Sequence, residues 1–364
     1  MIGTRGQSLL RSGLAGLFLG VFMLLTASAA GARPLAVMGK QIDIDNRFGS
    51  MFAPGSPPAA GPRSGSGPSA LHILVYLGRA DLIWLLHHYD EYSKFRAQLS
   101  PGDALVLYIP DDMLAKDADD FAGFVDRMFH GNRIFLYARA YKVSMMFDPN
   151  FWMHGRQPPD ARLLGTSSDL RQKVGRVYID HEADGYCQPS VPNSSAYPIA
   201  SLVCANGFPI DQIQPRIAFQ WSAMELKTLS DQIKSKGFTA GILPSGVSLL
   251  GHPRWDFGEL LLRSGAGYMI VQTQKYCSPA ITKDPSLATV RRAAETLHSQ
   301  VVRHSLPPDS VAAQISLQGR SGVSVDRALD CAREFEKSGM WNIFVLEGLI
   351  PNRTEFLQGV RSAR

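Results

Sequence analysis

Two carboxylate side chains, Asp180 and Glu182, lie two positions apart in the segment RVYIDHEADG, residues 176–185. The apolar part of this segment predicts a β-strand, and side chains alternate between the two faces of a strand. Tyr178, Asp180 and Glu182 therefore share one face. Two adjacent carboxylates repel each other and cost stability unless a function uses them. The pair predicts acid-base chemistry at the end of a strand.

A metal site is an alternative interpretation of this segment, because Asp180, His181, Glu182 and Asp184 supply oxygen and nitrogen donors within a short stretch. On a regular strand, however, His181 faces away from the two carboxylates. We therefore favour acid-base chemistry and expect no metal. We also expect no cofactor, since the glycines at 65 and 67 have neither a strand before them nor a helix after them, as a phosphate loop requires.

From residue 71 onward, short runs rich in β-branched and aromatic residues alternate with longer amphipathic runs. The expected strands are 71–77, 104–109, 133–138, 176–181, 239–243, 268–273, 311–317 and 342–346. The expected helices are 81–99, 117–130, 161–173, 222–236, 255–263, 285–304, 325–337 and 354–362. Eight strand-then-helix units predict an α/β fold, the (β/α)8 TIM barrel. An open, doubly wound sheet is the alternative.

In a TIM barrel, the active site lies at the carboxyl ends of the strands. Alternation along each expected strand gives an inward-facing set that is rich in tyrosine and amide side chains. Its members are Tyr76, Tyr108, Tyr137, Arg139, Tyr178, Asp180, Glu182, Gln272, Gln274, Tyr276, Gln314, Ser316, Gln318 and Glu347. Aromatic rings suit sugar faces, amides bind hydroxyls, and carboxylates serve acid-base catalysis. The set predicts a polyhydroxylated ligand, although any one tyrosine or glutamine could be structural.

The N-terminal region differs in composition from the expected barrel. Arg5 and Arg11 precede an apolar run, and small residues follow it, so residues 1–32 predict a secretory signal peptide. An uncleaved anchor is the alternative, but the run is short for spanning a bilayer. Residues 33–69 are rich in Pro, Gly and Ser and predict a flexible linker, which leaves 70–364 as one catalytic-type domain. We expect a secreted or periplasmic protein with no membrane attachment after cleavage.

Charge and cysteine content narrow the class of partner. The formal net charge is +5 with scattered Lys and Arg residues, so no nucleic-acid partner is expected. The spacing of Cys187, Cys204, Cys277 and Cys331 matches no zinc motif. An oxidising compartment would permit disulfides, of which Cys187–Cys204 is favoured; isolated buried thiols are the alternative.

Two strand ends resemble those of family 18 glycoside hydrolases. The segment YIDHE, residues 178–182, is similar to the Asp-x-Glu ending of the fourth-strand signature in that family. The segment QTQKY, residues 272–276, is similar to the Gln and Tyr pattern on the sixth strand. The resemblance implies a TIM-barrel glycosidase that acts on a polysaccharide or oligosaccharide.

The resemblance also implies roles for individual residues. Glu182 would be the general acid that protonates the departing glycosidic oxygen, with its pKa raised by Asp180. Asp180 would stabilise positive charge at the anomeric carbon, directly or through a substrate acetamido group that Tyr276 orients. A second version of the mechanism needs no acetamido group and uses Glu347 as the partner carboxylate.

A non-catalytic barrel that binds a glycan or another polar small ligand is the alternative function. The glycines and extra aspartates that precede Asp-x-Glu in the resembled family are missing here, and Glu347 stands at the end of the eighth strand in place of tryptophan. These departures favour binding without cleavage, whereas the paired acids Asp180 and Glu182 favour catalysis.

Overall fold

The computed structural model describes residues 36–37, 40–41, 71–110, 113, 115–147, 173–181, 215–244, 249–251, 254–279, 286–317 and 322–362. Near the N-terminus, β1 (Ala36–Val37) and β2 (Lys40–Gln41) form an antiparallel pair. The other described strands all belong to one closed barrel. Within these ranges, no helix is both long and apolar enough to cross a membrane.

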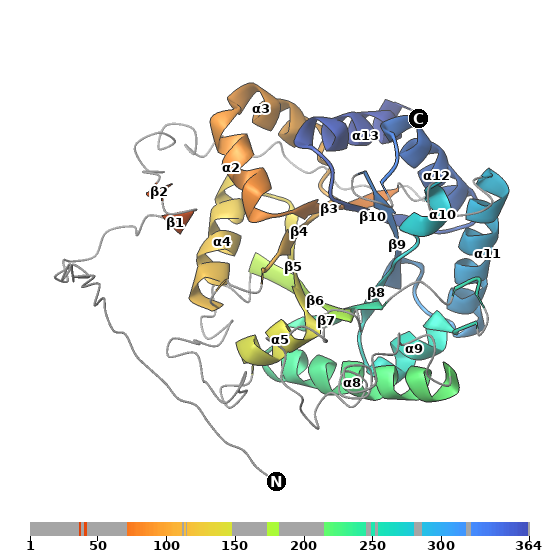
Figure 1. The fold of residues 1–364 in the computed structure, drawn as a ribbon. Coiled ribbons are helices and arrows are strands. Elements are labelled where there is room, and N and C mark those ends of the chain that lie inside the picture. Colours follow the sequence, from red (N-terminus) through yellow and green to blue (C-terminus); the bar gives the residue numbers. More distant parts are fainter. Residues whose placement is uncertain are drawn as a thin grey trace, which may run out of the picture.

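The barrel consists of eight parallel strands and is seen end-on in Figure 1. In chain order the strands are β3 (His72–Leu77), β4 (Ala104–Tyr108), β5 (Arg133–Arg139), β6 (Val174–His181), β7 (Thr239–Pro244), β8 (Tyr268–Val271), β9 (Val311–Ser316) and β10 (Asn342–Leu346). The ring closes because β10 pairs with β9 on one side and with β3 on the other. The predicted (β/α)8 TIM barrel is confirmed.

Helices surround the strands as an outer ring (Figure 1). They are α2 (Arg79–His87), α3 (Tyr89–Gln98), α4 (Ala115–Met128), α5 (Ala140–Phe147), α8 (Pro215–Ser235), α9 (Phe257–Ser264), α10 (Gln274–Cys277), α11 (Leu287–Arg303), the 3-10 turn η4 (Pro308–Ser310), α12 (Val325–Lys337) and α13 (Ile350–Ser362). The helix expected at 161–173 lies outside the described residues except at its last position.

Several element boundaries differ from the sequence prediction; α8, for example, begins at Pro215 and not at residue 222. The helix expected over 81–99 is broken at His88, whose ring stacks on Trp84 with centroids 4.2 Å apart and whose Nδ1 lies 2.8 Å from the Trp84 carbonyl oxygen. This local contact ends α2 before α3 begins. The strand expected over 268–273 ends at Val271, and a short helical turn follows it.

Strand side chains fill two separate core layers. One face of each strand packs against the helices, and the other face points into the barrel. The interior layer contains Leu74, Phe135, Tyr178 and Phe344, with smaller residues between them. Barrel strands therefore bury both faces, which is why their sequences are almost continuously apolar.

Gly241 on β7 provides the space that the Tyr178 ring occupies, because a Cβ atom at this position would overlap with Cδ1 and Cε1 of that ring. Gly241→Ala should therefore lower the free energy of unfolding by about 1–3 kcal/mol, measured by urea denaturation. Gly123→Ala is the matched control, since Gly123 lies within α4 with no atom near the new methyl group. The control should stabilise the protein by about 0.5–1 kcal/mol. Equal stability of the two variants would contradict this packing.

Two partly buried ion pairs join the last helix to the beginning of the barrel. Arg353 of α13 is 2% exposed and contacts both carboxylate oxygens of Asp81, at 2.8 and 3.1 Å. Arg361 of the same helix contacts both carboxylate oxygens of the buried Asp103, at 2.6 and 2.7 Å. These pairs connect chain segments more than 250 residues apart and hold α13 against α2 and the start of β4.

Cys277 and Cys331 are free, fully buried thiols that lie next to each other between α10 and α12. Burial, and then the neighbouring Cys331 thiol, raise the pKa of Cys277 well above its ordinary value. The favoured disulfide partners, Cys187 and Cys204, lie outside the described residues. A thiol with a raised pKa is a poor nucleophile at neutral pH.

We expect peptides containing Cys277 and Cys331 to stay unlabelled when the folded protein is pulsed with N-ethylmaleimide at pH 7. Both should be labelled in urea without a reductant, because unfolding exposes them and restores ordinary thiol reactivity. Mass spectrometry of the digested protein measures both results. Rapid labelling of the folded protein, or protection that persists in urea until a reductant is added, would be inconsistent with two buried free thiols.

Candidate active site at the carboxyl ends of the strands

Tyrosine side chains from three neighbouring strands gather inside the carboxyl end of the barrel. Tyr137 belongs to the interior layer, and Tyr76 and Tyr108 pack against it. The ring centroids are 6.0 Å apart for Tyr76 and Tyr108, 5.5 Å for Tyr108 and Tyr137, and 6.3 Å for Tyr76 and Tyr137. The inward orientation predicted from alternation is confirmed for these rings. Tyr178 also faces inward, but it lines a cavity at the other end of the barrel, where the strands begin, and not the mouth where the sequence placed it.

Asp180 lies beside this tyrosine cluster. The Tyr137 hydroxyl donates a hydrogen bond to Asp180 Oδ2 at 2.9 Å, and the carboxylate is only 4% exposed. In the register of β5 and β6, Arg139 is the partner of Asp180, so a guanidinium-bearing residue stands next to it on the neighbouring strand. A buried, oriented carboxylate inside the strand ends of a TIM barrel is placed where this fold carries out its chemistry.

His181 points the other way, as alternation predicted. Its Nε2 lies 2.6 Å from Glu225 Oε2 of α8, and both side chains are buried in the layer between strands and helices. His181 therefore does not share the barrel interior with Asp180. Among the described residues, no group of three or more His, Cys, Asp or Glu side chains could hold a metal ion.

Glu347 follows β10 and lines a cavity of about 660 Å³ at the barrel mouth, together with Tyr76, Tyr108 and Trp84. Its φ angle is 54°, a left-handed conformation that is uncommon for a residue other than glycine. The following Gly348 also has a positive φ, and its carbonyl oxygen accepts hydrogen bonds from Arg353. A strained backbone that its surroundings hold in place is typical of functional sites.

The tyrosine cluster and Glu347 influence each other electrostatically. Burial, followed by the charge of Asp81, the Tyr108 side chain and the charge of Glu347, raises the pKa of Tyr76. The Tyr76 hydroxyl is thus a neutral hydrogen-bond donor at any physiological pH. The cavity presents neutral rings and hydroxyls beside a carboxylate, which suits a polyhydroxylated ligand.

The residues after β8 are arranged differently from the sequence prediction. Because the strand ends at Val271, Gln274 and Tyr276 lie on the helical turn α10, and strand alternation does not apply to them. The Tyr276 ring packs in the outer layer, and its hydroxyl accepts a hydrogen bond from the Leu250 amide at 3.1 Å. Burial raises the pKa of Tyr276 to about 12. Gln272 is buried at the strand end.

Two further polar residues stand near the barrel mouth. Gln314 on β9 has the parity of the interior residue Ala312 and is buried, and within the described part of the chain its Oε1 has no hydrogen-bond partner. Lys275 was not among the predicted site residues; it lies on the helical turn α10, four positions after the end of β8. Burial lowers the pKa of Lys275 to about 8. Glu182 and Gln318 lie outside the described residues.

Comparisons of the sequence with known proteins found no relative. No protein-family model matches the sequence, and a search of curated proteins found no match. Similar solved structures include the catalytic domain of a family GH18 chitinase from the fern Peteris ryukyuensis, at 11% identity over 80% of this chain and 98% of that chain, with a TM-score of 0.41.

Two other similar structures come from different kinds of enzyme. The spore cortex-lytic enzyme SleL of Bacillus megaterium QM B1551 has 7% identity over 81% of this chain and 75% of that chain, with a TM-score of 0.43. A 2,3-dimethylmalate lyase of the PEP mutase/isocitrate lyase superfamily has 12% identity over 76% of each chain, with a TM-score of 0.37. Such weak similarity to hydrolase and lyase alike carries no information on activity.

Proposed function

We propose that this protein is a glycoside hydrolase that cleaves a polysaccharide or oligosaccharide at the carboxyl end of its barrel. The observation that supports this most is the placement of Asp180, which is buried inside the strand ends and accepts a hydrogen bond from Tyr137 at 2.9 Å. Glu182 follows two residues later and would share this face if the strand alternation continues. The proposal thus combines an oriented carboxylate, a second acid and a tyrosine-lined mouth.

In the proposed reaction, Glu182 donates its proton to the glycosidic oxygen as the bond to the anomeric carbon breaks. Asp180 stabilises the positive charge that develops at that carbon, directly or through a substrate acetamido group. Water then adds to the anomeric carbon and returns a proton to Glu182. The Tyr137 hydroxyl holds Asp180 in one orientation, which lowers the reorganisation needed during the reaction.

Glu347 is the second candidate for the partner carboxylate. It lines the mouth cavity with two of the tyrosines and has a strained backbone. If Glu347 acts with Glu182, their separation sets the stereochemistry: about 5–5.5 Å for retention and roughly 6.5–9.5 Å for inversion. The Tyr276 ring packs in the outer layer with its hydroxyl on the Leu250 amide, so the proposed role of Tyr276 in orienting an acetamido group would require that ring to turn toward the mouth.

The second candidate function is glycan binding without cleavage. It is favoured by Glu347, which stands where the resembled family has tryptophan, and by the tyrosine-lined cavity of about 660 Å³ beside it. Aromatic rings bind sugar faces whether or not an acid is in place. On either proposal, a leader in residues 1–32 would deliver the protein to a secreted or periplasmic location.

A panel of polysaccharides separates the two functions. For each polysaccharide, binding is measured by affinity electrophoresis and cleavage by the release of reducing ends. We expect the parent protein to cleave at least one of them, and Glu182→Gln to bind the same polysaccharide with cleavage reduced by about 10²–10⁴. Binding by the parent without any cleavage supports the second function and contradicts the first.

A further inference from the structure

A second cavity, of about 260 Å³, lies at the opposite end of the barrel, where the strands begin. It is called the basal cavity here. The residues that line it include His72, Arg133, Phe135, Arg176, Asp309 and Asn342. The interior layer of side chains separates the basal cavity from the proposed active site at the other end of the barrel. The basal cavity shares no lining residue with the mouth cavity.

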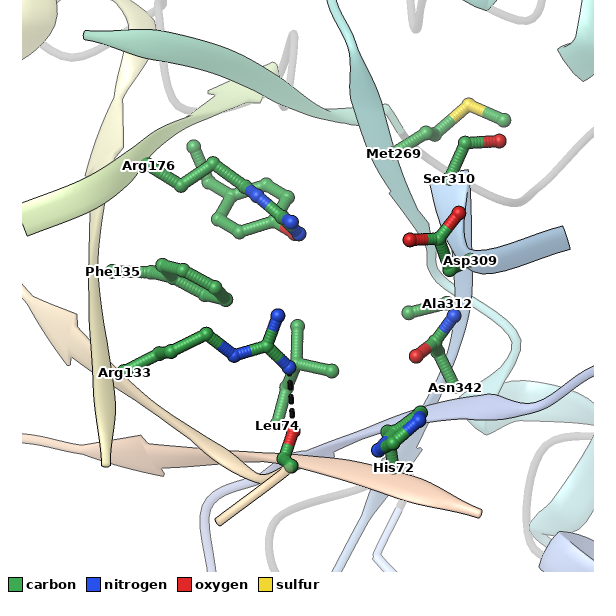
Figure 2. A pocket seen from close by; sticks show the side chains of 12 residues that line it. His72, Leu74, Arg133, Phe135, Arg176, Met269, Asp309, Ser310, Ala312 and Asn342 are labelled. Carbon is green, nitrogen blue, oxygen red and sulfur yellow. Dashed lines mark hydrogen bonds between the residues drawn. The ribbon is translucent and has the colours of Figure 1, made fainter. Parts of the chain in front are cut away.

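Two arginines on adjacent strands supply the charge of the basal cavity. Arg133 begins β5, and Arg176 lies near the start of β6, where it is the register partner of Phe135. Figure 2 shows both guanidinium groups extending from the same wall toward the centre of the cavity, above and below the Phe135 ring. His72, Asp309 and Asn342 stand on the other side.

The two guanidinium groups keep most of their hydrogen-bonding capacity. Arg133 donates to the Gly102 carbonyl oxygen, and Arg176 donates to the Tyr178 hydroxyl at 3.0 Å. In the part of the chain that the structure describes, neither arginine forms an ion pair with a carboxylate. Since a guanidinium carries five N–H donors, several on each arginine are available to a ligand.

Arg176 contacts two aromatic rings in this position. Its guanidinium carbon lies 4.4 Å from the centroid of the Phe135 ring and 3.0 Å from that of the Tyr268 ring. A guanidinium fixed by aromatic rings loses little conformational freedom when it binds an anion. Arg133 contributes to the local positive field as well, because its charge acts together with burial to lower the pKa of His72.

We propose that the basal cavity is a binding site for a small oxyanion, a phosphate or a carboxylate, held between Arg133 and Arg176. Two like charges that share one cavity repel each other, and a bound anion would offset that repulsion. Planar guanidinium groups match the paired oxygens of both ligand types. The volume corresponds to several water molecules, so a ligand of a few non-hydrogen atoms fits. Asp309 faces the arginines and would accept a hydrogen bond from a ligand hydroxyl.

Isothermal titration calorimetry on the full chain at low ionic strength tests this proposal, with inorganic phosphate, sulfate and malate as probes. We expect saturable binding of at least one probe. Arg133→Gln and Arg176→Gln should each weaken that binding by about tenfold or more. Asp309→Asn should strengthen it, because the variant removes a negative charge that faces the anion. Arg303→Gln, which removes an exposed ion pair with Asp256, is the matched control. This variant should leave the affinity for the anion unchanged.

The probes also distinguish the two ligand chemistries. Binding of phosphate and sulfate without malate assigns the site to a tetrahedral oxyanion, and binding of malate alone assigns it to a carboxylate. No saturable binding of any probe, or binding that Arg133→Gln leaves intact, would overturn the proposal. Arg133 is exposed at the start of its strand, so Arg133→Gln should fold normally. This variant therefore tests the proposal even if Arg176→Gln is unstable.

Discussion

Asp180→Asn is expected to lower the rate of glycoside hydrolysis by about 10²–10³, with little change in glycan binding. The variant keeps the size of the side chain, and an amide oxygen can still accept the hydrogen bond from Tyr137 that holds Asp180 in place. What it removes is the negative charge that faces the positive charge of the transition state. The loss should therefore be found in kcat and not in the affinity for the substrate.

Tyr137→Phe is the matched control for this prediction. It removes the hydroxyl that orients Asp180 but leaves the carboxylate and most of the tyrosine cluster in place. Its rate should fall by less than that of Asp180→Asn, since the loss of one orienting hydrogen bond is worth about 1–3 kcal/mol at most. Rates and substrate affinities of both variants are measured on a polysaccharide that the parent cleaves. Full activity of Asp180→Asn would exclude Asp180 from the mechanism.

The second large effect concerns stability. Arg353→Met should lower the free energy of unfolding by about 3–5 kcal/mol, because it removes one partner of a partly buried ion pair. Arg353 is 2% exposed, and its loss would remove both guanidinium contacts to Asp81, whose Oδ2 keeps the hydrogen bond from the Gly78 amide. It would also remove the hydrogen bonds that Arg353 donates to the carbonyl oxygens of Tyr76 and Gly348. Denaturation in guanidinium chloride, followed by circular dichroism, measures the change.

Arg263→Met provides the comparison for an exposed pair. Arg263 contacts Glu259 at 2.7 Å on α9, but the two side chains are 54% and 39% exposed. An exposed pair of this kind contributes about 0.2–1 kcal/mol. If Arg353→Met cost no more than Arg263→Met, the packing of α13 against α2 would not depend on this ion pair.

The barrel could be predicted from sequence because its strands bury both faces. Segments such as residues 104–108 are continuously apolar, and each is followed by an amphipathic run, so the eight units can be counted without tertiary information. The same regularity made strand alternation reliable for Tyr76, Tyr108 and Tyr137, whose rings meet inside the barrel. It also placed His181 correctly on the outer face.

Features that depend on contacts between distant segments could not be predicted. Residues 272–276 contain strand-forming side chains, yet they leave the strand because Tyr276 and Cys277 become buried in the outer layer as a helical turn. The partner of His181 is Glu225, which lies 44 positions away on α8. Alternation along a strand predicts on which face of the strand a side chain lies, but it does not predict which helix packs against that side chain.

The basal cavity was missed for a different reason. It lies at the strand starts, where a TIM barrel is not expected to carry its active site, although Arg133 and Arg176 have the same parity as the interior residues Phe135 and Tyr178. Two arginines at inward positions of adjacent strands are a signal that the sequence contains. Their lack of carboxylate partners within the described ranges became visible only in the structure.

The role of Glu182 as general acid is the central claim, and the leaving group of the substrate tests it most directly. Glu182→Gln cannot protonate the departing oxygen, but a dinitrophenolate leaving group needs no proton because it is already a stable anion. The measurement is kcat for parent and variant on two substrates with the same sugar, a natural oligosaccharide and its dinitrophenyl glycoside.

We expect the kcat of Glu182→Gln on the oligosaccharide to be about 10²–10⁴-fold lower than that of the parent. On the dinitrophenyl glycoside the loss should be no more than about tenfold, since the missing proton transfer contributes little there. Equal losses on the two substrates would contradict proton donation by Glu182. Undiminished cleavage of the oligosaccharide by Glu182→Gln would remove Glu182 from the mechanism.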